Sequence, residues 1–166
     1  MILKNKNILI TGAGKGIGRA CVNDFISKGG YVFALINQKK DNSKFKKHIN
    51  LKIYNGNVNN QKIINKIFEE SKKINKPINC LVNNAGLRFR KNFLKIRKDE
   101  LRNVFETNFF SPLVIMQIFS KFLIKNKMKG SLINMTSIVG KIGFDGLTGY
   151  ASSKGALTSL TKSFAA

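Results

Sequence analysis

The sequence predicts an α/β fold, a doubly wound parallel sheet with helices on both of its faces. Two observations predict it. Short apolar runs rich in Ile and Val alternate with longer segments of helical periodicity, which is the pattern of βαβ units. A glycine-rich segment, residues 11–18, joins the first apolar run to the first helical segment. The 166 residues, 43% of them hydrophobic, can bury one core, so we expect residues 1–166 to form a single domain.

The elements follow from this alternation in chain order. Five apolar runs are the expected strands: Asn7–Thr11, Tyr31–Ile36, Lys52–Tyr54, Asn79–Asn83 and Ser131–Met135. Apolar residues at helical spacing predict helices over Ile17–Lys28, Gln61–Lys73, Asp99–Lys125 with a break near Ser111-Pro112, and Tyr150–Ala165. The stretch from Asn37 to Asn50 is polar and Lys-rich, so we expect a loop with at most a short helix there. Because neither a stop signal nor a further strand follows the last helix, we expect a sheet that is incomplete at the C-terminus, as in a truncated domain.

The charge of the chain is large, since 30 Lys and Arg oppose 8 Asp and Glu and give a net charge of +22. The lysines are scattered through expected loops and helix ends, so we interpret them as solvated surface and expect no specific nucleic-acid partner. No stretch approaches the ~20 apolar residues of a membrane span, and the N-terminus leaves no room for a signal peptide, so we expect a cytoplasmic protein without membrane contact. Cys21 and Cys80 lie in apolar runs without metal-ligand spacing, which favours buried thiols over a disulfide or a metal site.

A glycine-rich turn follows the first expected strand. Its residues are Gly12, Gly14, Lys15, Gly16, Ile17 and Gly18. Glycines let the backbone turn tightly and approach a pyrophosphate closely, and the helix that follows offers free N–H groups and the positive end of its dipole. Because the turn lies between the first strand and the first helix of a βαβ unit, it predicts a dinucleotide site; the alternative is an ordinary strand-to-helix connection.

Three further side chains suggest acid–base chemistry. Tyr150 and Lys154 are four residues apart on an expected helix, so both project from one face. A phenol is a poor acid at neutral pH, and an adjacent ammonium favours the phenolate, which makes the pair a usable proton shuttle. Ser137 follows the last strand, at the carboxyl end where open α/β sheets bind ligands, and its hydroxyl can donate to a substrate carbonyl. The alternatives are a surface Tyr beside a solvated Lys and a Ser in a simple turn.

These motifs resemble the classical short-chain dehydrogenase/reductase family in order and spacing. The resemblance rests on Thr11-Gly12 with Gly16 and Gly18, on Asn83-Asn84-Ala85-Gly86 after the fourth strand, on Asn108, and on Ser137 with the run from Tyr150 to Lys154. It covers the chain from the first strand to the last residue. It implies a Rossmann-type fold and an oxidoreductase that moves hydride between a nicotinamide and a carbonyl or alcohol carbon.

The resemblance also implies a role for each matching residue. Tyr150 gives a proton to the substrate oxygen that Ser137 holds, so both bind substrate. Lys154 tunes Tyr150, and both bind the nicotinamide ribose. Asn108 helps to position a water in a proton relay, although a helix-interior Asn can also simply satisfy a backbone carbonyl. The residues expected to line the cofactor beyond the turn are Asn37, Asn57, Val58, Asn84, Ala85 and Gly86.

The expected cofactor is NADP(H) rather than NAD(H). An NAD site usually has an acidic side chain at the end of the second strand, to bind the ribose 2′-hydroxyl. Here Asn37 and Gln38 follow that strand, and Lys15 and Lys39 could meet a 2′-phosphate.

Among the branches of the family, the chain looks most like the 3-oxoacyl-[acyl-carrier-protein] reductases of fatty acid biosynthesis. That resemblance implies a small or acyl-carrier-bound carbonyl substrate and a homo-oligomer, and a basic surface suits an acidic carrier protein. Three alternatives stay open: a sugar, steroid or alcohol reductase or dehydrogenase of the same family, a truncated nucleotide-binding fragment without catalysis, and nucleic-acid binding through the charge.

Overall fold

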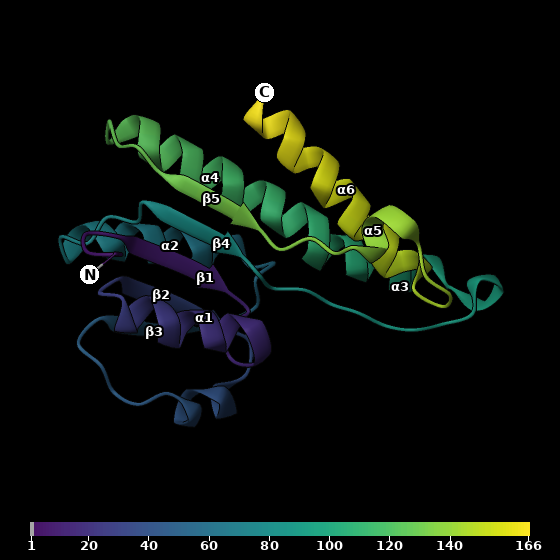
Figure 1. Ribbon diagram of the computed structural model, residues 1–166, viewed down its shortest axis with the longest axis horizontal. Helices are drawn as coiled ribbons and strands as arrows, with labels where there is room; N and C mark the ends of the chain where they lie inside the picture. The colour runs from purple at the N-terminus through teal and green to yellow at the C-terminus, as the bar shows by residue number, and fades with distance from the viewer. Residues whose placement is uncertain (1) are drawn as a thin grey trace.

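The computed structural model describes residues 2–166 and contains a five-stranded parallel sheet with helices on both faces (Figure 1). The strands, in sheet order, are β3 (Leu51–Asn55), β2 (Tyr31–Ile36), β1 (Asn7–Thr11), β4 (Cys80–Asn83) and β5 (Ser131–Asn134). In β1, Leu9 pairs with Phe33 of β2 on one side and Leu81 of β4 on the other. The strand order therefore reverses direction at β1, which places a ligand-binding crevice beyond the carboxyl ends of β1 and β4.

The helices bury the two faces of this sheet in two separate clusters. Helix α1 (Gly16–Ser27) packs through Val22 against Ile8 and Ile10. Helices α2 (Gln61–Lys73) and α4 (Ser111–Lys125) cover the opposite face. The second cluster contains Leu9, Phe33, Leu35 and Leu81 of the sheet, Ile64, Ile67 and Phe68 of α2, and Ile115, Met116 and Phe119 of α4. Because neighbouring residues of a strand face opposite sides, continuous apolar runs are what a sheet buried on both faces requires. The predicted fold class is confirmed.

The long helical region differs from the prediction at its middle. Instead of breaking near Ser111-Pro112, the chain stays helical from Lys98 to Lys125, with α3 (Lys98–Phe105) and α4 joined by a π-helical turn, η3 (Glu106–Phe110). Pro112 has no N–H to donate to the carbonyl of Asn108 four residues earlier, and wider π turns relieve such a conflict without ending a helix.

That continuous helix is long and apolar enough to cross a membrane by length and composition, with a mean hydropathy of 1.3 over its most apolar 18 residues. Its buried side chains Ile115, Met116 and Phe119 pack against the sheet and α2. A helix that packs against a hydrophobic core needs apolar side chains on its buried face, so this packing accounts for the apolar character of the helix.

The remaining elements surround the carboxyl ends of the strands. Helix α6 (Thr148–Ala165) begins two residues before the predicted helix, and the short helix η1 (Lys39–Lys44) lies within the expected polar loop. Two short helices were not predicted, η2 (Phe93–Lys95) and α5 (Val139–Ile142). In Figure 1, α5 lies against α6 at the end of the molecule where α3 and η2 also gather.

Candidate active site

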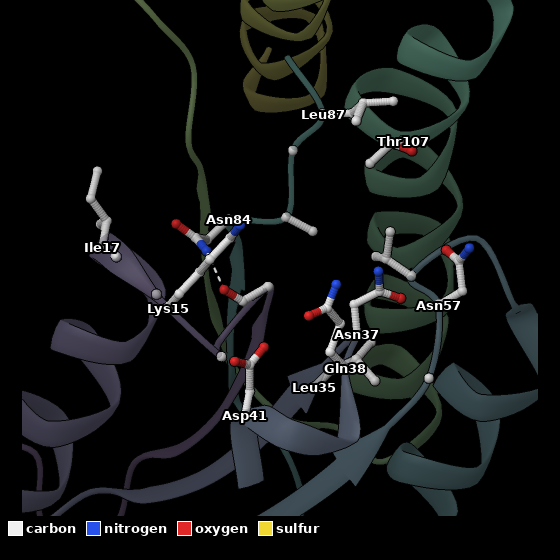
Figure 2. A pocket seen from close by; sticks show the side chains of 18 of the residues that line it. Lys15, Ile17, Leu35, Asn37, Gln38, Asp41, Asn57, Asn84, Leu87 and Thr107 are labelled. Atoms are coloured by element: carbon white, nitrogen blue, oxygen red, sulfur yellow. Dashed lines mark hydrogen bonds between the residues drawn. The ribbon is translucent and has the colours of Figure 1, made fainter. Parts of the chain in front are cut away.

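A cavity of about 780 Å³ lies at the carboxyl ends of the central strands (Figure 2). It is bounded by the glycine-rich turn, the segments that follow β2 and β3, and the segment after β4. All residues expected to line a cofactor, apart from Tyr150 and Lys154, border it: Gly12, Gly14, Lys15, Gly16, Ile17, Gly18, Asn37, Asn57, Val58, Asn84, Ala85 and Gly86. Residues far apart in sequence therefore meet at one cavity, at the position where a doubly wound sheet binds its ligand.

The glycine-rich turn is held tightly against the end of β4. Gly12 has a φ of +65°, and a Cβ there would lie 2.7 Å from the Cα of Ala85, so both conformation and space require glycine. The Thr11 hydroxyl accepts hydrogen bonds from the N–H groups of Asn84 (3.1 Å) and Ala85 (3.0 Å). The Asn84 side chain in turn donates to the carbonyls of Thr11 (2.9 Å) and Gly12 (3.1 Å). The two segments that flank the cavity are thus fixed relative to each other.

The start of α1 offers the groups that a phosphate needs. The helix begins at Gly16, inside the turn, and the side chain of its N-cap residue, Lys15, makes no capping hydrogen bond. Gly18 packs so closely on the carbonyl of Gly12 that a Cβ could not be accommodated. Free N–H groups at a helix N-terminus, backed by the helix dipole, are a general anion-binding arrangement. The residues present therefore fit the pyrophosphate of a dinucleotide.

One acidic side chain of the cavity wall was missed in the sequence. Asp41, in η1, lines the cavity and is only 7% exposed, although no carboxylate was expected near the end of β2. Lys40 rather than Lys39 borders the cavity. The available signal was distance along the chain, because Asp41 follows Gly18 at roughly the ~20-residue spacing typical of the ribose-binding acid. Further lining residues outside the prediction are Leu35, Gln38, Gly56, Leu87 and Thr107.

Lys154 is buried beside Tyr150 on α6. Its side chain is 4% exposed, and its Nζ donates a 2.6 Å hydrogen bond to the carbonyl of Met135, just beyond β5. The same Nζ lies 5.9 Å from the centre of the Tyr150 ring. Burial disfavours the ammonium and lowers the pKa of Lys154 from 10.5 to about 8. Because Tyr150 is only half-buried, this places a desolvated amine next to a phenol that solvent or substrate can reach.

Ser137 lies between β5 and α5, and a contact between two glycines holds this segment on α6. A Cβ at Gly140 of α5 would lie 2.7 Å from the backbone N of Gly155 and 3.0 Å from the backbone C of Lys154. The Ser137 carbonyl accepts the N–H of Gly140 at 3.1 Å, which ties the serine to that contact. The chain therefore returns from the sheet edge and contacts α6 at Gly155, the residue that follows Lys154.

Asn108 is fully buried in η3 and connects three segments. Its Oδ1 accepts the N–H of Leu87 (2.7 Å), and its Nδ2 donates to the Leu87 carbonyl (2.9 Å) and to the Ser153 hydroxyl (2.9 Å). Ser153, also fully buried, donates to the carbonyl of Tyr150 at 2.8 Å. Asn108 thus satisfies backbone groups and also fixes α6, so Ser153 is a positioning residue that the sequence analysis did not single out.

Gly86 joins the cavity to these side chains. It lines the cavity, and a Cβ on it would lie 3.5 Å from Asn108 Oδ1 and 3.6 Å from Lys154 Nζ. The structure thereby brings Asn108 and Lys154 close to the part of the cavity wall that Gly86 forms, with Tyr150 next to Lys154.

Comparison with known proteins gives consistent matches over nearly the whole chain. The model of the family described as short chain dehydrogenase matches residues 6–166. Carbonyl reductase [NADPH] 2 of Sus scrofa is 31% identical over 160 residues, which cover 95% of this chain and 63% of the relative. The 3-oxoacyl-[acyl-carrier-protein] reductase FabG of Haemophilus influenzae is 28% identical over 165 residues, which cover 98% of this chain and 68% of the relative. This chain therefore spans about two thirds of the length of these relatives.

Solved structures agree with the fold. A 4-hydroxyisoleucine dehydrogenase complexed with NADH has a TM-score of 0.85 and 29% identity, with 96% of this chain and 68% of that chain covered. A short chain dehydrogenase from Bacillus anthracis has a TM-score of 0.91 at 22% identity, with 97% of this chain and 69% of that chain covered, and supports the fold alone.

Proposed function

The chain belongs to the short-chain dehydrogenase family, and from this membership we propose that it is an NADP(H)-dependent oxidoreductase acting on a carbonyl or alcohol substrate. One observation carries the proposal. At Gly86, a cavity that fits a dinucleotide meets Asn108 and Lys154, beside which Tyr150 lies. Binding groups and acid–base groups are thus arranged around one site.

The side chains of this protein would donate the proton and stabilise the charge that develops during the reaction. The bound nicotinamide supplies or accepts the hydride. In the reductive direction, the Tyr150 hydroxyl gives its proton to the substrate oxygen, and the Ser137 hydroxyl donates a hydrogen bond to the same oxygen as negative charge develops on it. The Lys154 ammonium favours the phenolate that Tyr150 becomes.

The burial of Lys154 suits this role. With a pKa of about 8, the amine is protonated roughly ten to one at pH 7, so the cation is present, and its positive charge acts in a site largely shielded from water. The hydrogen bond to the Met135 carbonyl holds the Nζ in place. Asn108 and Ser153 fix the turn of α6 that carries Tyr150 and Lys154.

For the cofactor we propose NADP(H), as the sequence predicts. Asn37 and Gln38 follow β2 without an acid at the strand end, and Lys15 and Lys40 border the cavity. Two cations at the wall favour a 2′-phosphate, while Asp41 opposes them. The matched proteins include both a carbonyl reductase named for NADPH and a dehydrogenase complexed with NADH.

For the substrate we propose a 3-oxoacyl thioester carried by an acidic acyl-carrier protein. Several of the relatives are 3-oxoacyl-[acyl-carrier-protein] reductases, including that of Thermotoga maritima, 30% identical to this chain and 69% covered by it. The net charge of +22 favours encounter with an acidic carrier. The proposal includes a cytoplasmic, homo-oligomeric protein, as the resemblance implies.

The test is oxidation of NADPH with a β-keto thioester, followed by the absorbance of the reduced nicotinamide, in the native protein and in Tyr150→Phe. Loss of the proton donor should lower kcat about 10²- to 10⁴-fold. Tyr31→Phe is the matched control, because Tyr31 lies on β2 outside the cavity and should retain native rates. Equal rates in native and Tyr150→Phe proteins would refute the mechanism. No turnover in either, with nucleotide binding intact, would instead favour the nucleotide-binding alternative.

A further inference from the structure

A row of hydrogen-bonded polar side chains joins the ends of two strands to α6. Nδ2 of Asn83, the last residue of β4, donates to Oδ1 of Asn134, the last residue of β5, at 2.8 Å. Nδ2 of Asn134 donates to the hydroxyl of Thr161 on α6 at 2.9 Å and to Sδ of Met116 on α4 at 3.4 Å. Asn134 therefore connects two neighbouring strands to two helices.

The hydroxyl of Thr161 is held in one orientation by the helix. It donates its own hydrogen to the carbonyl of Leu157 at 2.7 Å, so toward Asn134 it acts as an acceptor. This requires the NH₂ group of Asn134 to face α6 and its oxygen to face Asn83, as the structure shows. Each member of the row thus determines the orientation of the next.

Thr161 lies on the same face of α6 as Lys154. The two are seven residues apart, close to two full turns, so their side chains project from one side of the helix, at points about 10 Å apart along its axis. Lys154 donates to the carbonyl of Met135, and Thr161 accepts from the side chain of Asn134, the residue before Met135. Two consecutive residues at the end of β5 therefore hold α6 at two points.

Apolar packing alone fixes the position of α6 less strictly. Among the buried residues of this helix, Leu157 is the large apolar side chain. Hydrophobic contacts are non-directional, whereas a hydrogen bond restricts both the distance and the angle between its atoms. Ser153, through Asn108, already holds the first half of α6. The contact of Thr161 with Asn134 is the corresponding attachment of the second half.

We infer that Thr161 is a positioning residue for the proposed reaction. Through Asn134 and Asn83 it fixes α6 along the end of β5, and this placement lets Lys154 reach the Met135 carbonyl beside Tyr150. The inference rests on the proposed function and adds to it a residue two turns away from the acid–base pair.

The test compares Thr161→Val, which keeps the shape of the side chain and removes the hydroxyl, with Thr158→Val. Thr158 is the matched control, because its hydroxyl also donates to a helix carbonyl four residues back, that of Lys154, at 2.9 Å. With NADPH and a β-keto thioester, Thr161→Val should lower kcat about tenfold and leave KM for NADPH within about twofold of the native value. Thr158→Val should keep the native kcat, and Thr161→Ser, which retains the hydroxyl, should restore most of it.

A second measurement reads the position of Lys154 without turnover. The proteins are treated briefly with acetic anhydride, and mass spectrometry compares acetylation of Lys154 with that of the exposed Lys162 on the same helix. The buried Lys154 should react slowly in the native protein. Its labelling relative to Lys162 should rise several-fold in Thr161→Val and stay at the native value in Thr158→Val and Thr161→Ser.

The other outcomes overturn the inference or the proposed function separately. If either kcat or the labelling ratio is the same in Thr161→Val as in Thr158→Val, Thr161 does not position Lys154, and the proposed function stands. If Thr161→Val raises KM for NADPH as much as it lowers kcat, the whole site has loosened, and the inference is also wrong. If the native protein shows no turnover, the proposed function fails, and the labelling ratios decide whether Thr161 holds Lys154 in place.

Discussion

Replacement of Lys154 by Met should change how stability depends on pH. Lys154 is buried with a folded pKa of about 8, against 10.5 when exposed. Between these values the unfolded chain binds a proton that the folded chain has lost, so the free energy of unfolding rises with pH in this window. Below pH 8 the full cost of the buried ammonium is present, and above pH 10.5 it is gone.

The size of the effect follows from the same two values. Each pKa unit corresponds to 1.36 kcal/mol, so titration from pH 7 to pH 10 should stabilise the native protein by about 2 to 3 kcal/mol through Lys154 alone. Lys154→Met retains the side-chain length but has no proton to lose. Other groups titrate in both proteins, and their contribution cancels in the difference between the two curves.

Urea denaturation at pH 7, 8, 9 and 10 measures this difference. The stability of the native protein relative to Lys154→Met should rise by about 2 to 3 kcal/mol over the series. Lys162→Met, at an exposed position further along α6, should follow the native curve. Parallel curves for native and Lys154→Met proteins, or a difference that falls with pH, would show that Lys154 is not desolvated as its burial indicates.

Three further outcomes are expected. Gly12→Ala should destabilise the protein by about 2 kcal/mol or more and weaken nucleotide binding, because the new Cβ meets Ala85 in a left-handed backbone; native-like denaturation and calorimetry would contradict this. Ser153→Ala should lower the free energy of unfolding by about 1 to 3 kcal/mol, because it leaves a buried N–H of Asn108 unpaired, and it should reduce kcat more than it raises KM. Ser153→Thr keeps the hydroxyl and should restore part of the stability and part of kcat. Glu70→Gln should reduce the loss of stability in acid, because hydrogen bonds from Lys52 and Tyr54 hold the pKa of Glu70 below its usual 4.5. The contribution of the Glu70 carboxylate to the free energy of unfolding is therefore present above that pH and disappears as the pH falls. If native and Glu70→Gln proteins lost the same stability in acid, this expectation would be refuted.

Parts of the fold were predictable because local sequence and tertiary packing demand the same structure. Strands β1 and β2 and helix α2 have the predicted bounds, since their apolar runs end where polar or glycine residues begin. Helix α2, for example, starts after Asn60, whose side chain accepts the N–H of Lys62 at 3.0 Å as an N-cap.

Other parts depend on contacts that no local pattern contains. Helix α5 has only four residues, and both its N-cap residue Ile138 and its last residue Ile142 are exposed, so it has no amphipathic signal. Its contact with α6 through Gly140 supports it. The sequence around Pro112 predicts a break and not a π-helical turn, because a Pro in a helical pattern does not reveal how the helix accommodates it. Asp41 lies in the cavity wall only because η1 folds back, which its position after β2 does not show.

The contact between Gly140 and Gly155 has a consequence for how the site can vary. The contact is between backbone atoms only. The distance between the segment that carries Ser137 and the helix that carries Tyr150 and Lys154 therefore cannot be adjusted by a side chain that changes its rotamer. A methyl group at Gly140 would lie 2.7 Å from the backbone N of Gly155 and push the two segments apart, and one at Gly155 would lie 3.0 Å from the Gly140 carbonyl oxygen. We therefore expect these two glycines to tolerate replacement much less well than exposed neighbours such as Ile142.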